Sequence, residues 1–315
     1  MENKQSHLIE RAAARLAKTK ATAPPSRFVS APRERDVRDA TTVPPDPDND
    51  LGHEARRSAE PRPRIDQAAL ATAGLVAYPN ARVLEELRIV ETRVLRQSFD
   101  KNGITGANGI TGAVNGAAST KAANVIMVTS ALKGEGKSFI SLNLAGEVVR
   151  QGDRRVLLID ADGKPHGLTR TLGVSSCPGL VDLATEFSLS IDEVLIPTTA
   201  DGLYVIPFGR GNERSGEVFA SRRMGEIIET IGRRYADSLI IIDAPPCLST
   251  STPHALASVC GQTVLVVGAN STQRGDVEAA LDLLQTCPHV SLLLNKVAPW
   301  MAHSFGSYSY PGLEN

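Results

Sequence analysis

The sequence lacks a long hydrophobic run and an excess of either charge. None of its apolar stretches approaches the roughly 18 residues that a membrane-spanning helix needs, and no secretory leader is recognisable. The 34 Lys and Arg residues are balanced by 35 Asp and Glu residues, and no basic stripe stands out. Proteins that bind nucleic acids usually carry such a stripe. We therefore expect a cytoplasmic protein with no nucleic-acid partner, whose membrane association, if any, comes through another protein.

Cysteine and histidine are also scarce. Cys177, Cys247, Cys260 and Cys287 are scattered without the spacing of metal ligands, and the six histidines do not cluster. This pattern predicts reduced, mostly buried thiols and gives the histidines no ligand role.

The part of the chain between Ala21 and Asp66 has very few residues that build a core. It holds eight of the 19 prolines, many interspersed charges and one aromatic residue, Phe28. Such a segment cannot bury enough apolar surface to offset the entropy that ordering costs. We predict a disordered arm.

Helices are predicted on both sides of this arm. Residues 6–18 carry apolar side chains at helical spacing and predict a short helix that either docks on a partner or membrane surface or frays. A longer helix is predicted over 83–99. Beyond it, the hexapeptide NGITGA occurs at 102–107 and again at 108–113. Two copies are too few for a repeat fold, so a flexible insertion is favoured over a β-solenoid rung.

The chain does contain a glycine-rich loop of the kind that binds phosphate. Residues 128–138 read VTSALKGEGKS; a predicted buried strand, Asn124–Val128, precedes the loop and a predicted helix follows it. The N–H groups of such a loop and the helix N-terminus attract an anion. Lys137 would reach the β- and γ-phosphates, and the Ser138 hydroxyl would ligate Mg²⁺. The loop predicts a nucleoside triphosphate site, although Ala131 stands where the usual motif has glycine.

Two further predicted strands end in carboxylates. The run RVLLIDAD places Asp160 and Asp162 on the same side of a strand if the strand conformation persists. The run LIIIDAPP repeats the pattern with Asp243. At the carboxyl ends of parallel strands these side chains would face the ligand crevice, where carboxylates hold Mg²⁺ and orient or deprotonate a hydroxyl. A single strand ending in Asp is equally explained by a turn or a helix cap.

Strands and helices are predicted to alternate from Asn124 onward. Further strands are predicted at 203–207, 263–268 and 290–295, and helices at 138–151, 221–235 and 272–286. This alternation predicts an α/β fold, in which helices cover both faces of a mostly parallel sheet.

The order of these motifs resembles the bacterial tyrosine kinases, a branch of the deviant P-loop ATPases. The likeness rests on the loop at 130–138, Asp-x-Asp at 160–162 and Asp-x-Pro-Pro at 243–246. The segments GEVFAS at 216–221 and LIERA at 8–12 more narrowly resemble the cytoplasmic tyrosine autokinases encoded with exopolysaccharide export systems. The resemblance spans roughly residues 75–300 and the N-terminal helix. It implies a P-loop NTPase fold of the deviant Walker type, which the disordered N-terminal arm predicted from composition would precede.

The resemblance implies an ATP-dependent protein-tyrosine autokinase that regulates exopolysaccharide or capsule biosynthesis and export, with ATP and Mg²⁺ as cofactors. Tyr308 and Tyr310 would be phosphoacceptors for a neighbouring subunit. The implied partner is a transmembrane chain-length or co-polymerase protein that recruits the kinase to the inner face of the membrane, and self-association is expected. The implied catalytic residues are Lys137, Asp160, Asp162 and Asp243; the nucleotide contacts are Gly134, Glu135, Gly136, Lys137, Ser138, Phe139 and Asn295; the metal contacts are Ser138, Asp160 and Asp243.

With this resemblance the chain divides into five parts. These are a short N-terminal helix (1–20), a disordered linker rich in proline and charge (21–75), a helix with a Gly-rich insertion (76–121), a P-loop kinase domain (122–300) and a flexible tail with the two tyrosines (301–315).

Several residues depart from the family pattern. Lys164 stands where the second motif usually has arginine, and lysine lacks the planar bidentate fork of arginine. Lys133 stands where proline is most common. The family's oligomerisation motif Glu-x-x-Arg-x-x-Arg is matched only by Glu85 and Arg88, because Glu91 replaces the last arginine. Ring assembly through this helix is therefore not predicted.

Two other functions stay open. A partition-type ATPase switch would hydrolyse ATP to position cargo, but such proteins carry a signature lysine where this chain has Leu132. A non-catalytic regulator of the export machine would bind nucleotide and act as a scaffold, which would account for Lys164 and the sparse tyrosine tail.

Overall fold

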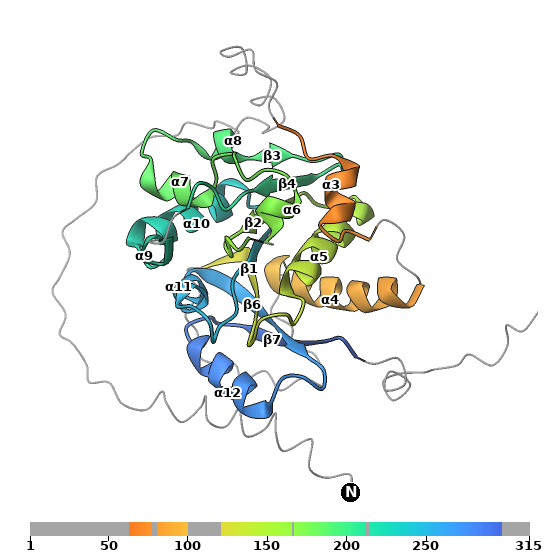
Figure 1. Ribbon diagram of the computed structural model, residues 1–315. Helices are drawn as coiled ribbons and strands as arrows, with labels where there is room; N and C mark the ends of the chain where they lie inside the picture. The colour runs from red at the N-terminus through yellow and green to blue at the C-terminus, as the bar shows by residue number, and fades with distance from the viewer. Residues whose placement is uncertain (1–62, 77–80, 100–120, 166, 212–214, 298–315) are drawn as a thin grey trace, which may run out of the picture. The chain divides into compact units, whose positions relative to one another are not determined.

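A computed structural model describes residues 63–76, 81–99, 121–165, 167–211 and 215–297 (Figure 1). The predicted N-terminal helix, most of the predicted linker, the Gly-rich insertion and the tail with Tyr308 and Tyr310 lie outside the described residues.

The described residues contain a seven-stranded sheet with strand order β3-β4-β2-β5-β1-β6-β7. Its strands are β1 (Ala122–Ser130), β2 (Val156–Asp160), β3 (Ile196–Pro197), β4 (Leu203–Ile206), β5 (Leu239–Asp243), β6 (Cys260–Gly268) and β7 (Val290–Asn295). Neighbouring strands are parallel, except that β3 runs antiparallel to β4. Every residue of β2 and β5 is buried, as expected for parallel strands covered on both faces. The predicted mostly parallel α/β fold is confirmed.

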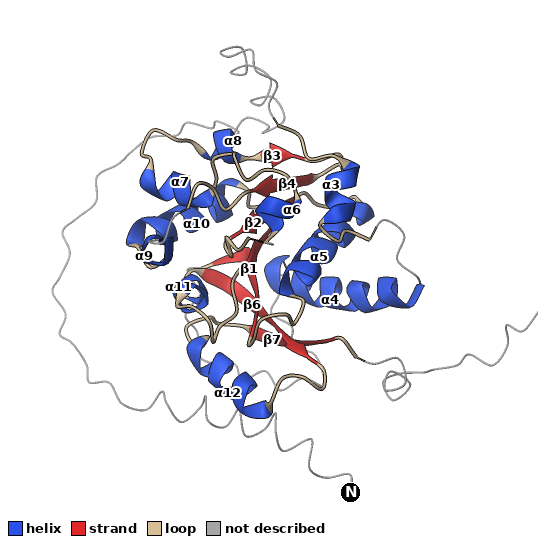
Figure 2. Cartoon of the chain, in the orientation of Figure 1, coloured by secondary structure: helices blue, strands red, loops and turns tan. Residues whose placement is uncertain are grey.

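Helices cover both faces of this sheet (Figure 2). Side chains alternate along β1, so that Val125 and Met127 join one apolar core while Ile126 and Val128 join the other. The first core is shared with α7 (Leu180–Thr185), α8 (Ile191–Val194), α9 (Ser215–Phe219), α10 (Arg222–Arg234), α11 (Thr252–Ala257) and α12 (Arg274–Leu283). The second is shared with α3 (Gln67–Thr72), α4 (Ala81–Phe99), α5 (Lys137–Gln151) and α6 (Leu168–Thr171). All four cysteines are free, and three of them are buried.

The two edges of the sheet differ. At one edge, the backbone of Ile65 bridges in parallel to Thr198, directly after the short strand β3. At the other edge, β7 has no outer neighbour among the described residues. Its side chains Leu292 and Leu294 are 54% and 55% exposed.

The prediction of a disordered linker over 21–75 is wrong for its last part, residues 63–75. Ile65 and Leu70 are buried, and Asp66 caps α3 by accepting a hydrogen bond from the N–H of Ala69 at 2.8 Å. Asn143 of α5 bonds to the backbone of this segment on both sides of Leu75, at 2.9 Å each. Composition averaged over 21–75 did not reveal the few apolar residues, such as Ile65 and Leu70, with which the last part of this region packs against the core.

Replacing Leu70 with alanine should therefore destabilise the whole folded domain. A fully buried leucine contributes its transfer free energy, and its truncation leaves a cavity, so we expect a loss of about 3 kcal/mol. Urea titration of the full chain measures this loss. Gln67→Ala, an exposed change on the same helix, should alter stability by less than about 0.5 kcal/mol. Equal stability of the two variants would show that α3 does not dock.

Two carboxylates meet inside the contact between α4 and α5. Glu91 and Glu147 are each 1% exposed. Gln151 donates a hydrogen bond to Glu91, while Arg88 and Arg150 lie 3.6 Å and 2.8 Å from Glu147. Burial, followed by the charge of Glu147, raises the pKa of Glu91 to about 7. Glu91 stands at the position of the last arginine in the motif Glu-x-x-Arg-x-x-Arg, and its side chain is buried between α4 and α5.

Glu91→Gln should stabilise the protein at alkaline pH. The folded-state pKa lies above the unfolded value of 4.5, so this group's stabilising contribution is complete below pH 4.5 and is lost as the pH rises through about 7. At 1.36 kcal/mol per pKa unit, the variant should gain about 3 kcal/mol at pH 8 and less than about 1 kcal/mol at pH 5. Urea titrations at both pH values measure the gain. The exposed change Glu85→Gln on the same helix is the control, and a pH-independent effect of Glu91→Gln would contradict the assignment.

Candidate functional site

The sheet brings the three sequence motifs to one edge. The strand order places β2, β5 and β1 side by side, and their register sets Asp243 opposite Asp160 on one side and Val128 on the other. The glycine-rich loop that follows β1 therefore begins beside the carboxylates that end β2 and β5. This is the carboxyl edge, where ligands of open parallel sheets bind.

Glycine is required in the loop by the backbone and by a close neighbour. Gly134 and Gly136 have left-handed φ angles of 83° and 97°, and Gly136 is the N-cap residue of α5. A Cβ atom on Gly136 would lie 2.3 Å from the side-chain nitrogen of Asn295. The loop thus ends at a helix N-terminus with its amides available to an anion.

Lys137 lies at the centre of the site. Its ammonium group forms an ion pair with Asp162 and lies 3.9 Å from the Oδ1 atom of Asp243. Burial by itself would lower the pKa of Lys137, but the charges of Asp243 and Asp162 raise it above the ordinary value. Lys164 lies 3.0 Å from Asp162 and remains about one-third exposed. Asp162 is therefore held between two lysines.

The surroundings of the Asp243 carboxylate fit a bound cation. It is fully buried; its Oδ1 atom accepts a hydrogen bond from Ser141 at 3.2 Å, and its Oδ2 atom has no hydrogen-bond partner among the described residues. Burial raises its pKa to about 7 despite the nearby Lys137. No group of three or more His, Cys, Asp or Glu side chains in the described ranges could hold a metal alone. The oxygens of Asp243 and Ser138 fit Mg²⁺ bound together with phosphate oxygens.

The structure separates Asp160 from Asp162, which the sequence treated as a pair on one side of a strand. Strand β2 ends at Asp160, so Asp162 lies beyond the strand. Asp160 accepts hydrogen bonds from the N–H and hydroxyl of Thr169 at 2.8 Å and 2.7 Å, and from the N–H of Asp162 at 2.9 Å. Both oxygens of Asp160 are thus used to hold the chain that follows β2, whereas Asp162 faces Lys137.

Three predicted nucleotide contacts have other neighbours here. The carboxylate of Glu135 is buried and accepts hydrogen bonds from the N–H of Gly268, at 2.8 Å, and from the hydroxyl of Thr272. Asn295 donates its amide to the carbonyl of Glu135. Phe139 is 41% exposed on α5. The side chain of Glu135 therefore holds the loop from within the protein, and the side chain of Asn295 binds the loop's backbone.

Sequence reasoning missed several polar residues of the site. Thr169 and Thr272 hold Asp160 and Glu135, and they lie 9 and 137 residues away from them along the chain. Ser141, four residues after Lys137, contacts Asp243. A signal was present only for Ser141, because residues i and i+4 of a helix lie on one face.

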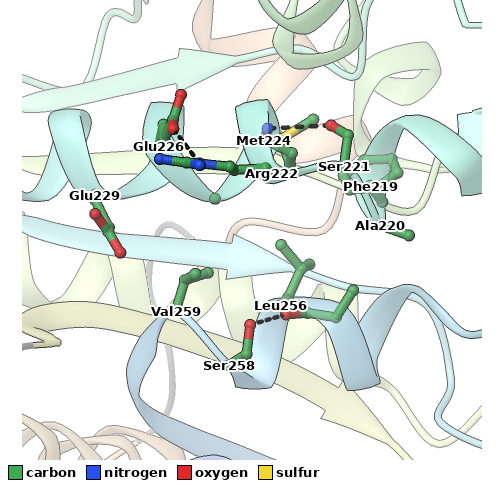
Figure 3. Close-up of a pocket in the computed structure, with 12 residues that line it drawn as sticks. Phe219, Ala220, Ser221, Arg222, Met224, Glu226, Glu229, Leu256, Ser258 and Val259 are labelled. Carbon is green, nitrogen blue, oxygen red and sulfur yellow. Dashed lines mark hydrogen bonds and ion pairs between the residues drawn. The ribbon is translucent and has the colours of Figure 1, made fainter.

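Figure 3 shows a groove lined by residues of α9, α10 and α11 and of the turns beside them. The lining of this groove of about 500 Å³ includes Arg222, Glu226 and Ser258, and no lining residue belongs to the phosphate loop or to the carboxylates that end β2 and β5. Three lining residues, 219–221, do belong to the GEVFAS segment. Arg222 pairs with Glu226, and Ser258, the C-cap residue of α11, donates to the carbonyl of Ala255. No buried polar atom without a hydrogen-bond partner lines it, so the loop remains the candidate site.

Known proteins are similar to this chain in sequence and in fold. No family model matches the chain. The chain is 33% identical over 162 residues to EpsB of Ralstonia solanacearum, across 51% of this chain and 21% of EpsB, so it spans about a fifth of that relative's length. It is 30% identical over 178 residues to the tyrosine-protein kinase CpsD of Streptococcus pneumoniae, across 55% of this chain and 76% of CpsD.

Solved kinase domains are similar as well. The BceF tyrosine kinase domain superposes with a TM-score of 0.54 and 26% identity, over 69% of this chain and 79% of that one. The VpsO kinase domain gives 0.50 and 31%, over 55% and 85%.

A parallel sheet with a glycine-rich loop between β1 and α5 and carboxylates at the ends of β2 and β5 defines a P-loop NTPase of the deviant Walker type. Within that class the chain belongs to the bacterial tyrosine-protein kinases.

No helix among the described residues is both long and apolar enough to cross a membrane.

Proposed function

We propose that this chain is an ATP-dependent protein-tyrosine autokinase that acts in exopolysaccharide or capsule biosynthesis and export. The observation that carries the proposal is the buried Lys137, which lies between Asp162 and Asp243 at the N-terminus of α5. Membership of the tyrosine-protein kinases supports tyrosine as the acceptor.

The residues of the site would act mainly by positioning and charge. Lys137 exchanges its ion pair with Asp162 for the phosphates, and the loop amides bind phosphate oxygens. Mg²⁺, held by Ser138 and Asp243, would neutralise charge on the transferred phosphoryl group. Asp162, released by Lys137 and still held by Lys164, accepts the proton of the tyrosine hydroxyl, whose unperturbed pKa is about 10.

The acceptors we propose are Tyr308 and Tyr310 of a neighbouring copy, so the kinase would self-associate during the reaction. Added phosphate charges would then favour dissociation of the subunits. The proposed partner is a transmembrane chain-length protein of the export system, which would recruit this chain from the cytoplasm to the inner face of the membrane. These finer assignments rest on the motif resemblance.

One experiment tests the proposal. The full chain is incubated with MgATP, with and without the cytoplasmic segment of a membrane protein encoded beside it, and phosphotyrosine is measured. Phosphotyrosine that is reduced in the double variant Tyr308→Phe, Tyr310→Phe supports the autokinase. Hydrolysis of ATP without phosphotyrosine would indicate a switch of the partition type, and binding without turnover a scaffold. The half-buried Leu132 at the switch lysine's position argues against the former.

A further inference from the structure

The phosphate loop is held from outside by Asn295, the last residue of β7, and by Lys296, which follows it. The side-chain amide of Asn295 donates to the carbonyl of Glu135 at 2.8 Å, and the ammonium group of Lys296 donates to the carbonyl of Gly134 at 2.6 Å. Lys296 itself has a left-handed φ of 60°, which is rare for a residue other than glycine. Backbone strain of this kind tends to occur at functional sites.

These contacts fix the direction of two loop amides. In a planar trans peptide the C=O of one residue and the N–H of the next point in opposite directions, and no peptide bond in the described chain is cis. With the carbonyl of Gly134 turned toward Lys296, the N–H of Glu135 points the other way. Because the carbonyl of Glu135 is turned toward Asn295, the N–H of Gly136 points away from Asn295.

Both N–H groups are free to bind a ligand. Neither the N–H of Glu135 nor that of Gly136 donates to an acceptor among the described residues. An unpaired amide is costly when it is removed from water without a partner, and anion sites at helix N-termini supply such partners.

The carboxylate of Glu135 fixes the loop from a third direction. It accepts hydrogen bonds from the N–H of Leu132 within the loop and from Gly268 at the end of β6. The loop is thus tied to the carboxyl ends of β6 and β7. These contacts constrain a loop in which Lys133 stands at the position where the family pattern has a proline.

We propose that Asn295 and Lys296 are positioning residues of the phosphate loop: by holding two loop carbonyls they aim the N–H groups of Glu135 and Gly136 at the phosphates. The proposal rests on the proposed function, since it concerns the same nucleotide site. It gives Asn295 a task other than the direct contact with the nucleotide that the sequence resemblance implied. The two N–H groups would bind the phosphates equally well in bound ATP and in the transition state. Loss of the Asn295 or Lys296 contact should therefore raise KM for ATP and leave kcat nearly unchanged.

The test compares Lys296→Met and Asn295→Ala with Lys296→Arg, which keeps a donor, and with Lys133→Met, which removes an equal charge from the exposed side of the same loop. We expect MgADP affinity, measured by calorimetry, to fall about fivefold to tenfold in the first two, as for loss of one hydrogen bond from a partly exposed donor. Lys296→Arg should restore most of the affinity, and Lys133→Met should change it less than about twofold. Equal losses for Lys133→Met and Lys296→Met would reduce the effect to net charge and overturn the proposal.

A second readout keeps this test separate from the proposed function. In the ligand-free protein, the NMR amide signals of Glu135 and Gly136 should be single and sharp in the wild type and shifted or broadened in Lys296→Met and Asn295→Ala. Unchanged signals in both variants would overturn the positioning role. If the wild-type chain binds no MgADP but the two variants show these signal changes, the nucleotide function is refuted while the positioning role of Asn295 and Lys296 in the loop is supported.

Discussion

Lys137→Met should abolish tyrosine phosphorylation, with a fall in rate of about 10³-fold. Lys137 is the cation that lies nearest both Asp162 and Asp243, and phosphoryl transfer depends on neutralising charge that spreads over the phosphate oxygens. Removing one preorganised donor of this kind typically costs about 10²- to 10³-fold. The rate is measured as phosphotyrosine formed per active site under saturating MgATP.

The same variant should also be less stable in the absence of nucleotide. Asp243 is fully buried and Asp162 nearly so, and both would lose their buried partner. Breaking a buried pair by removing one member costs about 3 kcal/mol. Lys133→Met, the exposed change on the same loop, controls for loss of charge. Normal phosphorylation by Lys137→Met would exclude this loop as the catalytic site.

Asp162→Asn should lower kcat by about 10²-fold or more, whereas Asp160→Asn should act mainly on stability and leave most of kcat. Asp162 is the carboxylate beside Lys137, and a general base contributes about 10²- to 10⁴-fold. In Asp160→Asn, the amide N–H₂ replaces one of the two carboxylate oxygens and would face a donor: either the N–H and hydroxyl of Thr169 or the N–H of Asp162. Leaving such a buried donor unpaired costs about 1–3 kcal/mol.

Steady-state rates and urea midpoints of the two variants separate these roles. A larger fall in kcat for Asp160→Asn, at unchanged stability, would make Asp160 the base and Asp162 the positioning residue. Thr169→Ala provides a further check, because it removes the hydroxyl that donates to Asp160 and accepts from the N–H of Phe208, and it leaves Asp162 untouched. It should reproduce the loss of stability in Asp160→Asn and retain most of kcat.

The sequence predicted the parts of this site that depend on local pattern. Strand periodicity and the spacing of Gly134, Gly136, Lys137 and Ser138 set the loop between a strand and a helix, and apolar runs ending in Asp set the carboxylates at the same edge. These features need only a few consecutive residues, so a pattern can reveal them.

The parts that the sequence did not predict depend on partners distant along the chain. The split between Asp160 and Asp162 depends on where β2 stops and on Thr169, which lies in α6. The inward turn of Glu135 depends on Gly268 and Thr272, more than 130 residues later. Likewise, docking of residues 63–75 depends on a surface that α5 and β3 create, which composition cannot reveal.

The unequal edges of the sheet limit how copies of this domain can join. A sheet edge is a template for another strand, and Ile65 already occupies the backbone beside β3. Among the described residues only β7, with its exposed Leu292 and Leu294, offers a full-length unpaired edge. Growth through sheet edges would therefore need β7 to meet β7 of a second copy about a twofold axis. Such a contact closes on itself, so it would produce pairs and not open-ended fibres.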